Sequence, residues 1–172
     1  QLQGWLDQAR RGVRQVVFVA GEAGMGKTPL VDAFLARVAA ETPLWLARGQ
    51  CIAHHGAGEA YLPMLDALGR LCRRPGSESL LAWLSQHAPT WLVQMPALLG
   101  AAELEALQPR VLGATRERML RELGEAVEAL TVEHPLILVL EDLHWSDYAT
   151  LDLVSWLAQR REPARLLLLG TY

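Results

Sequence analysis

An eight-residue glycine-rich segment constrains the fold of this 172-residue chain more than any other feature. Residues 21–28 read Gly-Glu-Ala-Gly-Met-Gly-Lys-Thr and fit the pattern G-x-x-x-x-G-K-[ST]. Residues 16–20, just before it, form a β-branched and aromatic run that is typical of a buried strand. Apolar residues recur at helical spacing over residues 30–38. The order strand, glycine-rich loop, helix predicts an α/β fold in which this loop lies at the carboxyl edge of a parallel sheet.

The residue types in this loop are those that a phosphate site requires. We expect Gly21, Gly24 and Gly26 to let the backbone take positive φ and approach an anion, and the loop N–H groups to converge on it with the helix N-terminus. Lys27, the only lysine beside fifteen arginines, supplies a charge for β- and γ-phosphates, and the Thr28 hydroxyl is placed to ligate Mg²⁺. The alternative is a structural glycine-rich turn, which the strand–loop–helix context disfavours. The predicted phosphate-binding residues are Gly21, Glu22, Ala23, Gly24, Met25, Gly26, Lys27, Thr28 and Pro29.

A pair of acidic residues follows a second predicted strand. Residues 136–140 are a continuous apolar run, as expected of a strand covered on both faces, and Glu141 and Asp142 come directly after it. We expect one carboxylate to engage Mg²⁺, directly or through water, and the other to polarise the attacking water. The spacing does not assign the two roles. A solvated acidic pair is the alternative, and the glycine-rich motif favours the functional interpretation.

Helices and strands alternate along the chain, which predicts a parallel sheet with right-handed crossovers. Strands are expected at residues 13–20, 44–51, 136–140 and 166–171. Helices are expected at 2–11, from the loop to about 40, and at 61–73, 77–87, 101–107, 115–132 and 147–160. The length suits one domain, and we expect residues 1–172 to be one domain of a longer multidomain protein.

Composition excludes several classes of protein. The longest apolar runs, 136–140 and 166–169, are far shorter than the ~18 residues that span a bilayer, and the chain does not open with a signal segment. A net charge of −3 argues against a surface that tracks DNA or RNA. Cys51 and Cys72 are too few for a disulfide framework and lack metal-ligand spacing. We therefore expect a cytoplasmic domain with no membrane contact and no direct contact with nucleic acid.

Three weaker candidates have structural alternatives that we favour. The His-Trp pair at 144–145 could touch a nucleotide or a neighbouring subunit, but packing of the loop onto the sheet is the simpler interpretation. The His-His pair at 54–55 lacks a third metal ligand at suitable spacing. An arginine finger could come from Arg116, Arg118 or Arg121, but a solvated helix face is the more common arrangement.

Four segments of the chain carry a resemblance to a known family. They read GEAGMGKT, GQCIAHHGAGEAYLPMLDALGRL, HPLILVLEDLHWSDYATLDLVSWLA and LLLLGTY. Together they resemble the AAA-type/STAND P-loop ATPase domain of large bacterial signalling proteins. Such proteins include LuxR-type (MalT-like) transcriptional regulators and ATPase-bearing adenylate/guanylate cyclases. The resemblance spans most of the chain and is weakest over residues 75–113.

The resemblance implies a P-loop NTPase fold of three α/β/α layers and the additional-strand type, in which the fourth strand lies between the first and third. In this family Lys27 and Thr28 would take the phosphate and Mg²⁺ roles. Glu141 stands where relatives usually have the Mg²⁺-associated Asp, and Asp142 stands where they have the second acid. We expect this sequence to be truncated at both ends relative to the family's domain. The parts that would lie beyond it are the base-holding segment, the fifth strand, the helical lid and the arginine that senses the γ-phosphate.

The function that this resemblance implies is an ATP- and Mg²⁺-dependent regulatory switch with slow hydrolysis. Its partners would be ATP or ADP, other domains of the same chain, and further copies that assemble when nucleotide binds. The alternatives are a faster energy-coupling ATPase and, with less support, a P-loop small-molecule kinase.

Overall fold

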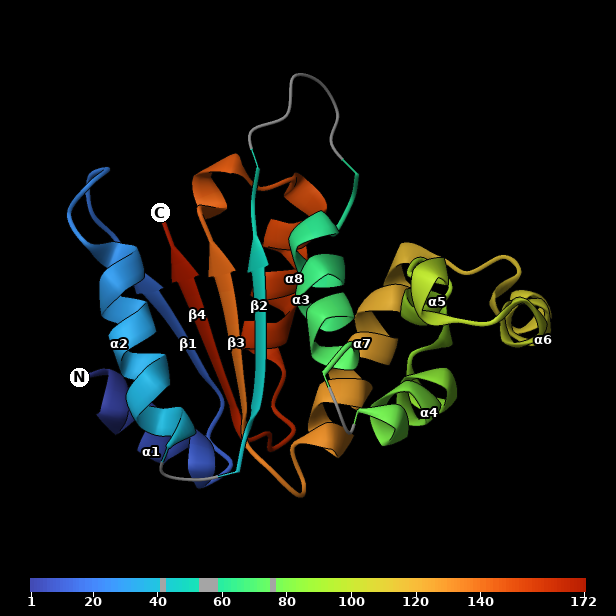
Figure 1. The fold of residues 1–172 in the computed structure, drawn as a ribbon, viewed down its shortest axis with the longest axis horizontal. Helices are drawn as coiled ribbons and strands as arrows, with labels where there is room; N and C mark the ends of the chain where they lie inside the picture. Colours follow the sequence, from blue (N-terminus) through green and yellow to red (C-terminus); the bar gives the residue numbers. More distant parts are fainter. Residues whose placement is uncertain (41–42, 53–58, 75–76) are drawn as a thin grey trace.

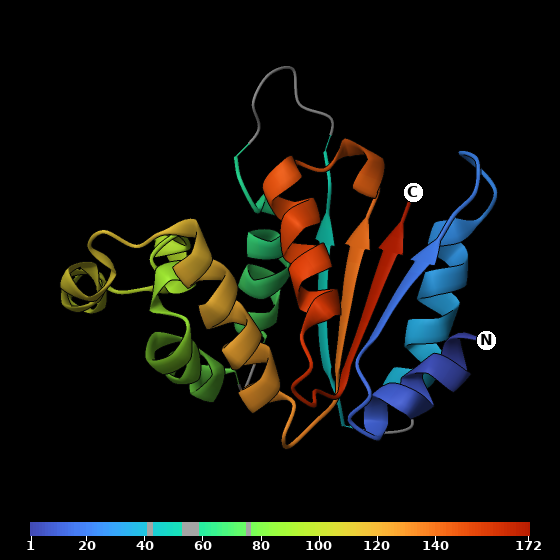
Figure 2. The same ribbon diagram turned by 180° about the vertical axis from the view of Figure 1, so that it is seen from behind.

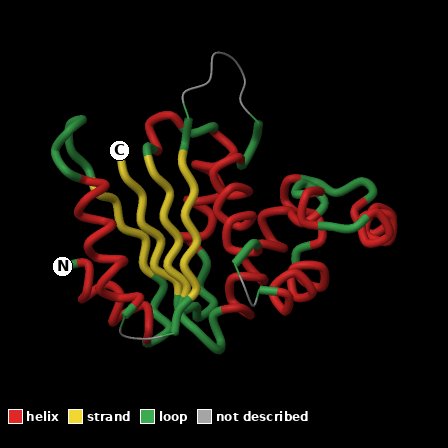
Figure 3. Tube along the Cα trace, in the orientation of Figure 1, coloured by secondary structure: helices red, strands yellow, loops and turns green. Residues whose placement is uncertain are grey.

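A computed structural model of the chain describes residues 1–40, 43–52, 59–74 and 77–172. Four parallel strands form one sheet in the order β1-β4-β3-β2 (Figures 1 and 3). The strands are β1 (Gln15–Val19), β2 (Trp45–Gln50), β3 (Leu136–Glu141) and β4 (Leu166–Thr171). The longer helices are α1 (Leu2–Arg10), α2 (Lys27–Ala39), α3 (Leu62–Cys72), α4 (Glu78–His87), α6 (Ala101–Val111), α7 (Arg116–Leu130) and α8 (Tyr148–Gln159). The short ones are α5 (Pro89–Leu92), η1 (Pro96–Leu98) and η2 (Leu143–Trp145). The parallel α/β fold is therefore confirmed, with β4 between β1 and β3.

The central strands β3 and β4 are buried along their whole length. Side chains of a strand alternate between the two faces, and β3 shows this clearly. Leu136, Leu138 and Leu140 belong to the apolar core on one face, whereas Ile137 and Val139 belong to the core on the other. Both faces are therefore covered, which explains why these strands are continuous apolar runs in the sequence.

Helices form an outer layer on each face of the sheet. α1 and α2 cover one face, and α3 and α8 cover the other, as the two opposite views show (Figures 1 and 2). The arrangement is the expected three-layer α/β/α architecture. It brings the loop before α2 and the segment after β3 to the same edge of the sheet, where the parallel strands end.

Helices α4 to α7, which we call the helical extension (residues 78–130), project from one side of the sheet (Figure 1). A buried carboxylate joins two of them: Glu122 accepts hydrogen bonds from the backbone N and Oγ1 of Thr90, both at 2.9 Å. The Trp91 indole donates to the Met119 carbonyl oxygen at 2.8 Å. These contacts fix α5 against α7.

Most predicted boundaries agree with the structure within two residues. The exception is α6, predicted to end near 107, which continues to Val111 through Pro109. The proline lies in the last turn, so its missing N–H removes only one hydrogen bond near the helix end. Among the described helices, none is long and apolar enough to cross a membrane. The His-His pair at 54–55 lies outside the described residues.

Candidate functional site

The glycine-rich loop joins the end of β1 to the first turn of α2. Two of its glycines have left-handed backbone conformations, with φ of 83° at Gly24 and 82° at Gly26. Side-chain-bearing residues adopt such angles at a cost, which explains glycine at both positions. Gly26 is also the N-cap of α2, so the first N–H groups of the helix face the loop. The predicted strand–loop–helix unit is therefore present.

The Lys27 side chain folds back over this loop. Its Nζ donates to the carbonyl oxygens of Gly21 at 2.6 Å and of Glu22 at 3.1 Å. The ammonium charge is thus held against the loop backbone at the exposed carboxyl edge of the sheet. A hydrogen bond from the Gly21 N–H to the Tyr172 carbonyl oxygen, at 3.2 Å, ties the start of the loop to the end of β4.

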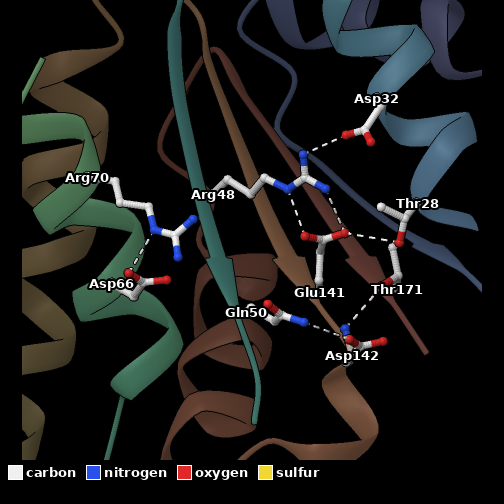
Figure 4. Close-up of polar contacts among 9 residues, drawn as sticks. All are labelled: Thr28, Asp32, Arg48, Gln50, Asp66, Arg70, Glu141, Asp142 and Thr171. Atoms are coloured by element: carbon white, nitrogen blue, oxygen red, sulfur yellow. Dashed lines mark hydrogen bonds and ion pairs between the residues drawn. The ribbon is translucent and has the colours of Figure 1, made fainter.

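The two acidic residues after the apolar run of β3 point to different partners (Figure 4). Glu141 is the last residue of β3 and is buried, whereas Asp142 is half-buried and has a left-handed φ of 56°. The Asp142 N–H donates to Oγ1 of Thr171 at 3.0 Å, and its carboxylate accepts a hydrogen bond from Gln50 at 3.3 Å. The backbone changes conformation at residue 142, so the carboxylates of Glu141 and Asp142 have different partners. The spacing of the two residues in the sequence does not predict this.

A hydrogen bond joins the glycine-rich loop to the acidic pair. The Thr28 hydroxyl donates to Oε1 of Glu141 at 3.3 Å, across 113 residues of sequence. A hydroxyl and a carboxylate are the hard oxygen donors that Mg²⁺ takes, usually beside substrate phosphates rather than in an all-protein cage. No group of three or more His, Cys, Asp or Glu side chains forms such a cage within the described part of the chain. The residues present therefore fit a metal shared between protein and phosphate.

Arg48 of β2 is a site residue that the sequence patterns did not predict. Its guanidinium holds the Glu141 carboxylate with two hydrogen bonds, from Nε at 2.7 Å and from Nη2 at 2.8 Å. Its Nη1 donates to Asp32 of α2 at 2.6 Å. The hydrogen bond with Glu141 raises the pKa of Arg48 further above neutrality, so the charge is permanent. The one feature of the sequence that could have indicated its role is its charge, since it follows the apolar residues 44–47 in a predicted parallel strand.

Two of the four segments that carry the resemblance, the second and the third, meet at Asp147. This residue caps α8: its Oδ1 accepts from the Thr150 N–H at 2.9 Å and its Oδ2 from the Thr150 hydroxyl at 2.6 Å. The same Oδ1 accepts a hydrogen bond from the backbone N–H of Tyr61, directly before α3, at 3.3 Å. The Tyr61 ring in turn packs on Trp91 of the helical extension, with centroids 5.1 Å apart.

The structure corrects the packing role that we favoured for the His-Trp pair. His144 is exposed and Trp145 is 55% exposed, and their rings contact each other with centroids 5.1 Å apart. The preceding residue, Leu143, is the buried one and lies against Gly170 of β4. The loop is therefore anchored to the sheet by Leu143, and the two aromatic rings face outward.

The three arginines considered as arginine fingers each have an acidic partner within the chain. The pairs are Arg116–Asp152, Arg118–Glu122 at 2.7 Å and Arg121–Glu125 at 4.0 Å. Arg118 is the most enclosed of the three and also donates to the carbonyl oxygen of Arg110 at 2.8 Å. These contacts support the helix-face interpretation.

A large groove lies beside the glycine-rich loop rather than at the acidic pair. It has a volume of about 780 Å³ and runs along the outer edge of β1 between α1 and α2. Its lining is largely apolar, with Trp5, Phe18, Leu30 and Phe34 among its residues. Val19 and Ala20 also line it, so the groove reaches the residue before the loop.

Comparison with known families agrees with this geometry. A family model described as an AAA ATPase domain matches residues 1–169. Searches of curated proteins and of solved structures gave no significant match. The match covers the glycine-rich loop, the acidic pair, strands β1 to β3 and the first four residues of β4. The chain therefore belongs to the AAA ATPase domain family, a family of nucleotide-binding ATPases.

Proposed function

We propose that residues 1–172 form an ATP- and Mg²⁺-binding regulatory switch, with slow hydrolysis, within a larger bacterial signalling or transcription regulator of the LuxR type. The observation that carries this proposal is the 3.3 Å hydrogen bond between Thr28 and Glu141. It joins the glycine-rich loop and the acidic strand end, the two elements that a P-loop ATPase needs at one edge of the sheet. ATP or ADP, neighbouring domains and further copies of the protein are the proposed partners.

The phosphate-binding role falls on the loop of residues 21–26 and on Lys27. The loop N–H groups and the start of α2 supply oriented donors, and helix N-termini favour anions. The Lys27 ammonium already lies against the loop through Gly21 and Glu22, so its charge needs little movement to reach a bound phosphate. This arrangement stabilises the β- and γ-phosphates by charge-assisted hydrogen bonds.

We assign different roles to the two acids because their partners differ. Glu141 lies beside Thr28, so these two residues would hold Mg²⁺, with Glu141 in direct contact or through water. Asp142 is more exposed and accepts only from Gln50 among the described side-chain donors, so its carboxylate can orient and deprotonate water. When bound, Mg²⁺ neutralises charge on the phosphate oxygens.

ATP binding by the full-length protein tests this proposal. Substituting Lys27→Ala removes charge-assisted hydrogen bonds worth about 3 kcal/mol, which lowers ATP affinity about 100-fold. The matched control is Arg37→Ala, which removes a cation from the exposed side of the same helix, where its partner is Gln3. Titration calorimetry should show an affinity within about threefold of wild type for this control.

Retention of ATP affinity in Lys27→Ala would refute the site. Steady-state turnover of the full-length protein separates a switch from an energy-coupling ATPase, since a switch hydrolyses ATP slowly. Product analysis with candidate phosphate acceptors would reveal a kinase.

A further inference from the structure

Arg48 makes three hydrogen bonds to two carboxylates at the metal side of the site (Figure 4). Two of its nitrogens hold both oxygens of Glu141, the planar fork geometry that makes arginine–carboxylate pairs strong. The third nitrogen holds Asp32 on α2. One side chain of β2 therefore connects the tip of β3 with the helix that follows the glycine-rich loop.

The Glu141 carboxylate is the most enclosed group in this network. Its side chain is 11% exposed, against 30% for Arg48 and 51% for Asp32. Its Oε1 accepts from both Arg48 and Thr28, and its Oε2 accepts from Arg48. The negative charge that faces Thr28 is therefore already offset by a cation of the protein itself, in surroundings that screen charges less than water does.

We propose that Arg48 is a positioning residue that competes with Mg²⁺ for the charge of Glu141 and so sets the Mg²⁺ concentration that nucleotide binding requires. This inference rests on the proposed nucleotide-binding function of the site. Arg48 holds the carboxylate next to Thr28 and also reduces its attraction for a divalent cation. The two effects come from the same pair of hydrogen bonds.

Asp32 gives the Arg48 guanidinium a second acidic partner besides Glu141. If Glu141 shared its charge with a metal ion, the Arg48 guanidinium would keep its hydrogen bond to Asp32 and would not become a cation without a partner. Conversely, removal of the Asp32 charge leaves Glu141 as the one carboxylate in this network that pairs with Arg48. The two substitutions Arg48→Met and Asp32→Asn should therefore change the Mg²⁺ requirement in opposite directions.

The experiment titrates free Mg²⁺ against a fixed concentration of fluorescent ATP analogue bound to the full-length protein. In Arg48→Met the midpoint should fall on the order of tenfold, the size of effect that one unit charge has on a divalent ion nearby. In Asp32→Asn it should rise about threefold. The matched control is Arg70→Met, the same substitution in the exposed Arg70–Asp66 pair of α3, and its midpoint should equal that of wild type (Figure 4).

An unchanged or higher midpoint in Arg48→Met would overturn the inference, as would a lower midpoint in Asp32→Asn. General destabilisation would move both variants the same way, so the opposed signs separate competition from loss of structure. Asp32 lies on the exposed side of α2, so Asp32→Asn still decides the matter if Arg48→Met fails to fold.

A second readout separates this inference from the proposed function. Mn²⁺ binding without nucleotide, followed by electron paramagnetic resonance, should be about tenfold tighter in Arg48→Met than in wild type or Arg70→Met. A wild-type protein that binds no nucleotide would refute the proposed function. Equal Mn²⁺ affinities in all three proteins would refute the role of Arg48.

Discussion

A largely buried ion network at the opposite end of the sheet from the glycine-rich loop allows a quantitative prediction. Glu128 of α7 accepts a hydrogen bond from Arg14, which precedes β1, at 2.9 Å, and another from Nη2 of Arg160, which follows α8, at 2.6 Å. The three side chains are only 6–16% exposed. Removing one partner of such a buried pair costs about 3–5 kcal/mol, because it leaves uncompensated charge behind.

We expect the Glu128→Ala substitution to cost about 3 kcal/mol, the lower end of that range. Both arginines keep other contacts: Arg14 donates to the Leu157 carbonyl oxygen at 2.8 Å, and the Arg160 guanidinium lies 4.6 Å from the centroid of the Trp156 ring. For a chain of 172 residues the unfolding entropy near the midpoint is about 0.36 kcal/mol/K, so the melting temperature should fall by about 8 °C.

Differential scanning calorimetry of wild type and two variants measures this fall. The control is Glu125→Ala, about one turn earlier in α7, whose pair with Arg121 spans 4.0 Å with both side chains more than half exposed. Such surface pairs contribute at most about 1 kcal/mol, so the control should melt within about 3 °C of wild type. Equal shifts in the two variants would show that burial does not govern the strength of these ion pairs.

Two further predictions concern glycines and thiols. Gly49→Ala should lower the free energy of unfolding, measured by chemical denaturation, by more than about 4 kcal/mol, because the new Cβ would overlap the Pro63 carbonyl oxygen. In the control Gly4→Ala, in α1, the new Cβ meets no atom, so this variant should be neutral or stabilised by up to about 1 kcal/mol. Equal stabilities would contradict this. Burial raises the pKa of the Cys51 and Cys72 thiols to about 11. Thiols of the unfolded chain ionise near pH 9, so the contribution of the two protonated thiols to the free energy of unfolding is complete below pH 9. It is lost as the pH rises to about 11, and the melting temperature should fall over this range. A melting temperature that stays constant from pH 9 to pH 11 would refute this prediction.

The local elements of the fold were predictable because their signals are local. Continuous apolar runs predicted β3 and β4, since strands covered on both faces have no polar side. Glycine at positions 21, 24 and 26 predicted positive φ in the loop; Gly24 and Gly26 adopt it, and Gly21 does not. The place of β4 between β1 and β3 came from the family resemblance and not from any local pattern.

Other features depend on contacts that sequence patterns do not reveal. Arg48 meets Glu141 across 93 residues, and no spacing rule connects them. The separation of the two carboxylates follows from the left-handed backbone of Asp142, a conformation that residues other than glycine seldom adopt. Leu143, and not Trp145, lies against β4, and Trp145 is exposed.

The shared carboxylate of Asp147 has a consequence for how this domain can vary. One side chain fixes the first turn of α8 and also positions the residue from which α3 departs. The Tyr61 ring also contacts the Trp91 ring of the helical extension, at an interplanar angle of 60°. Replacing Asp147 with a residue that has no side-chain acceptor would therefore remove the cap of α8 and the contact with Tyr61 together.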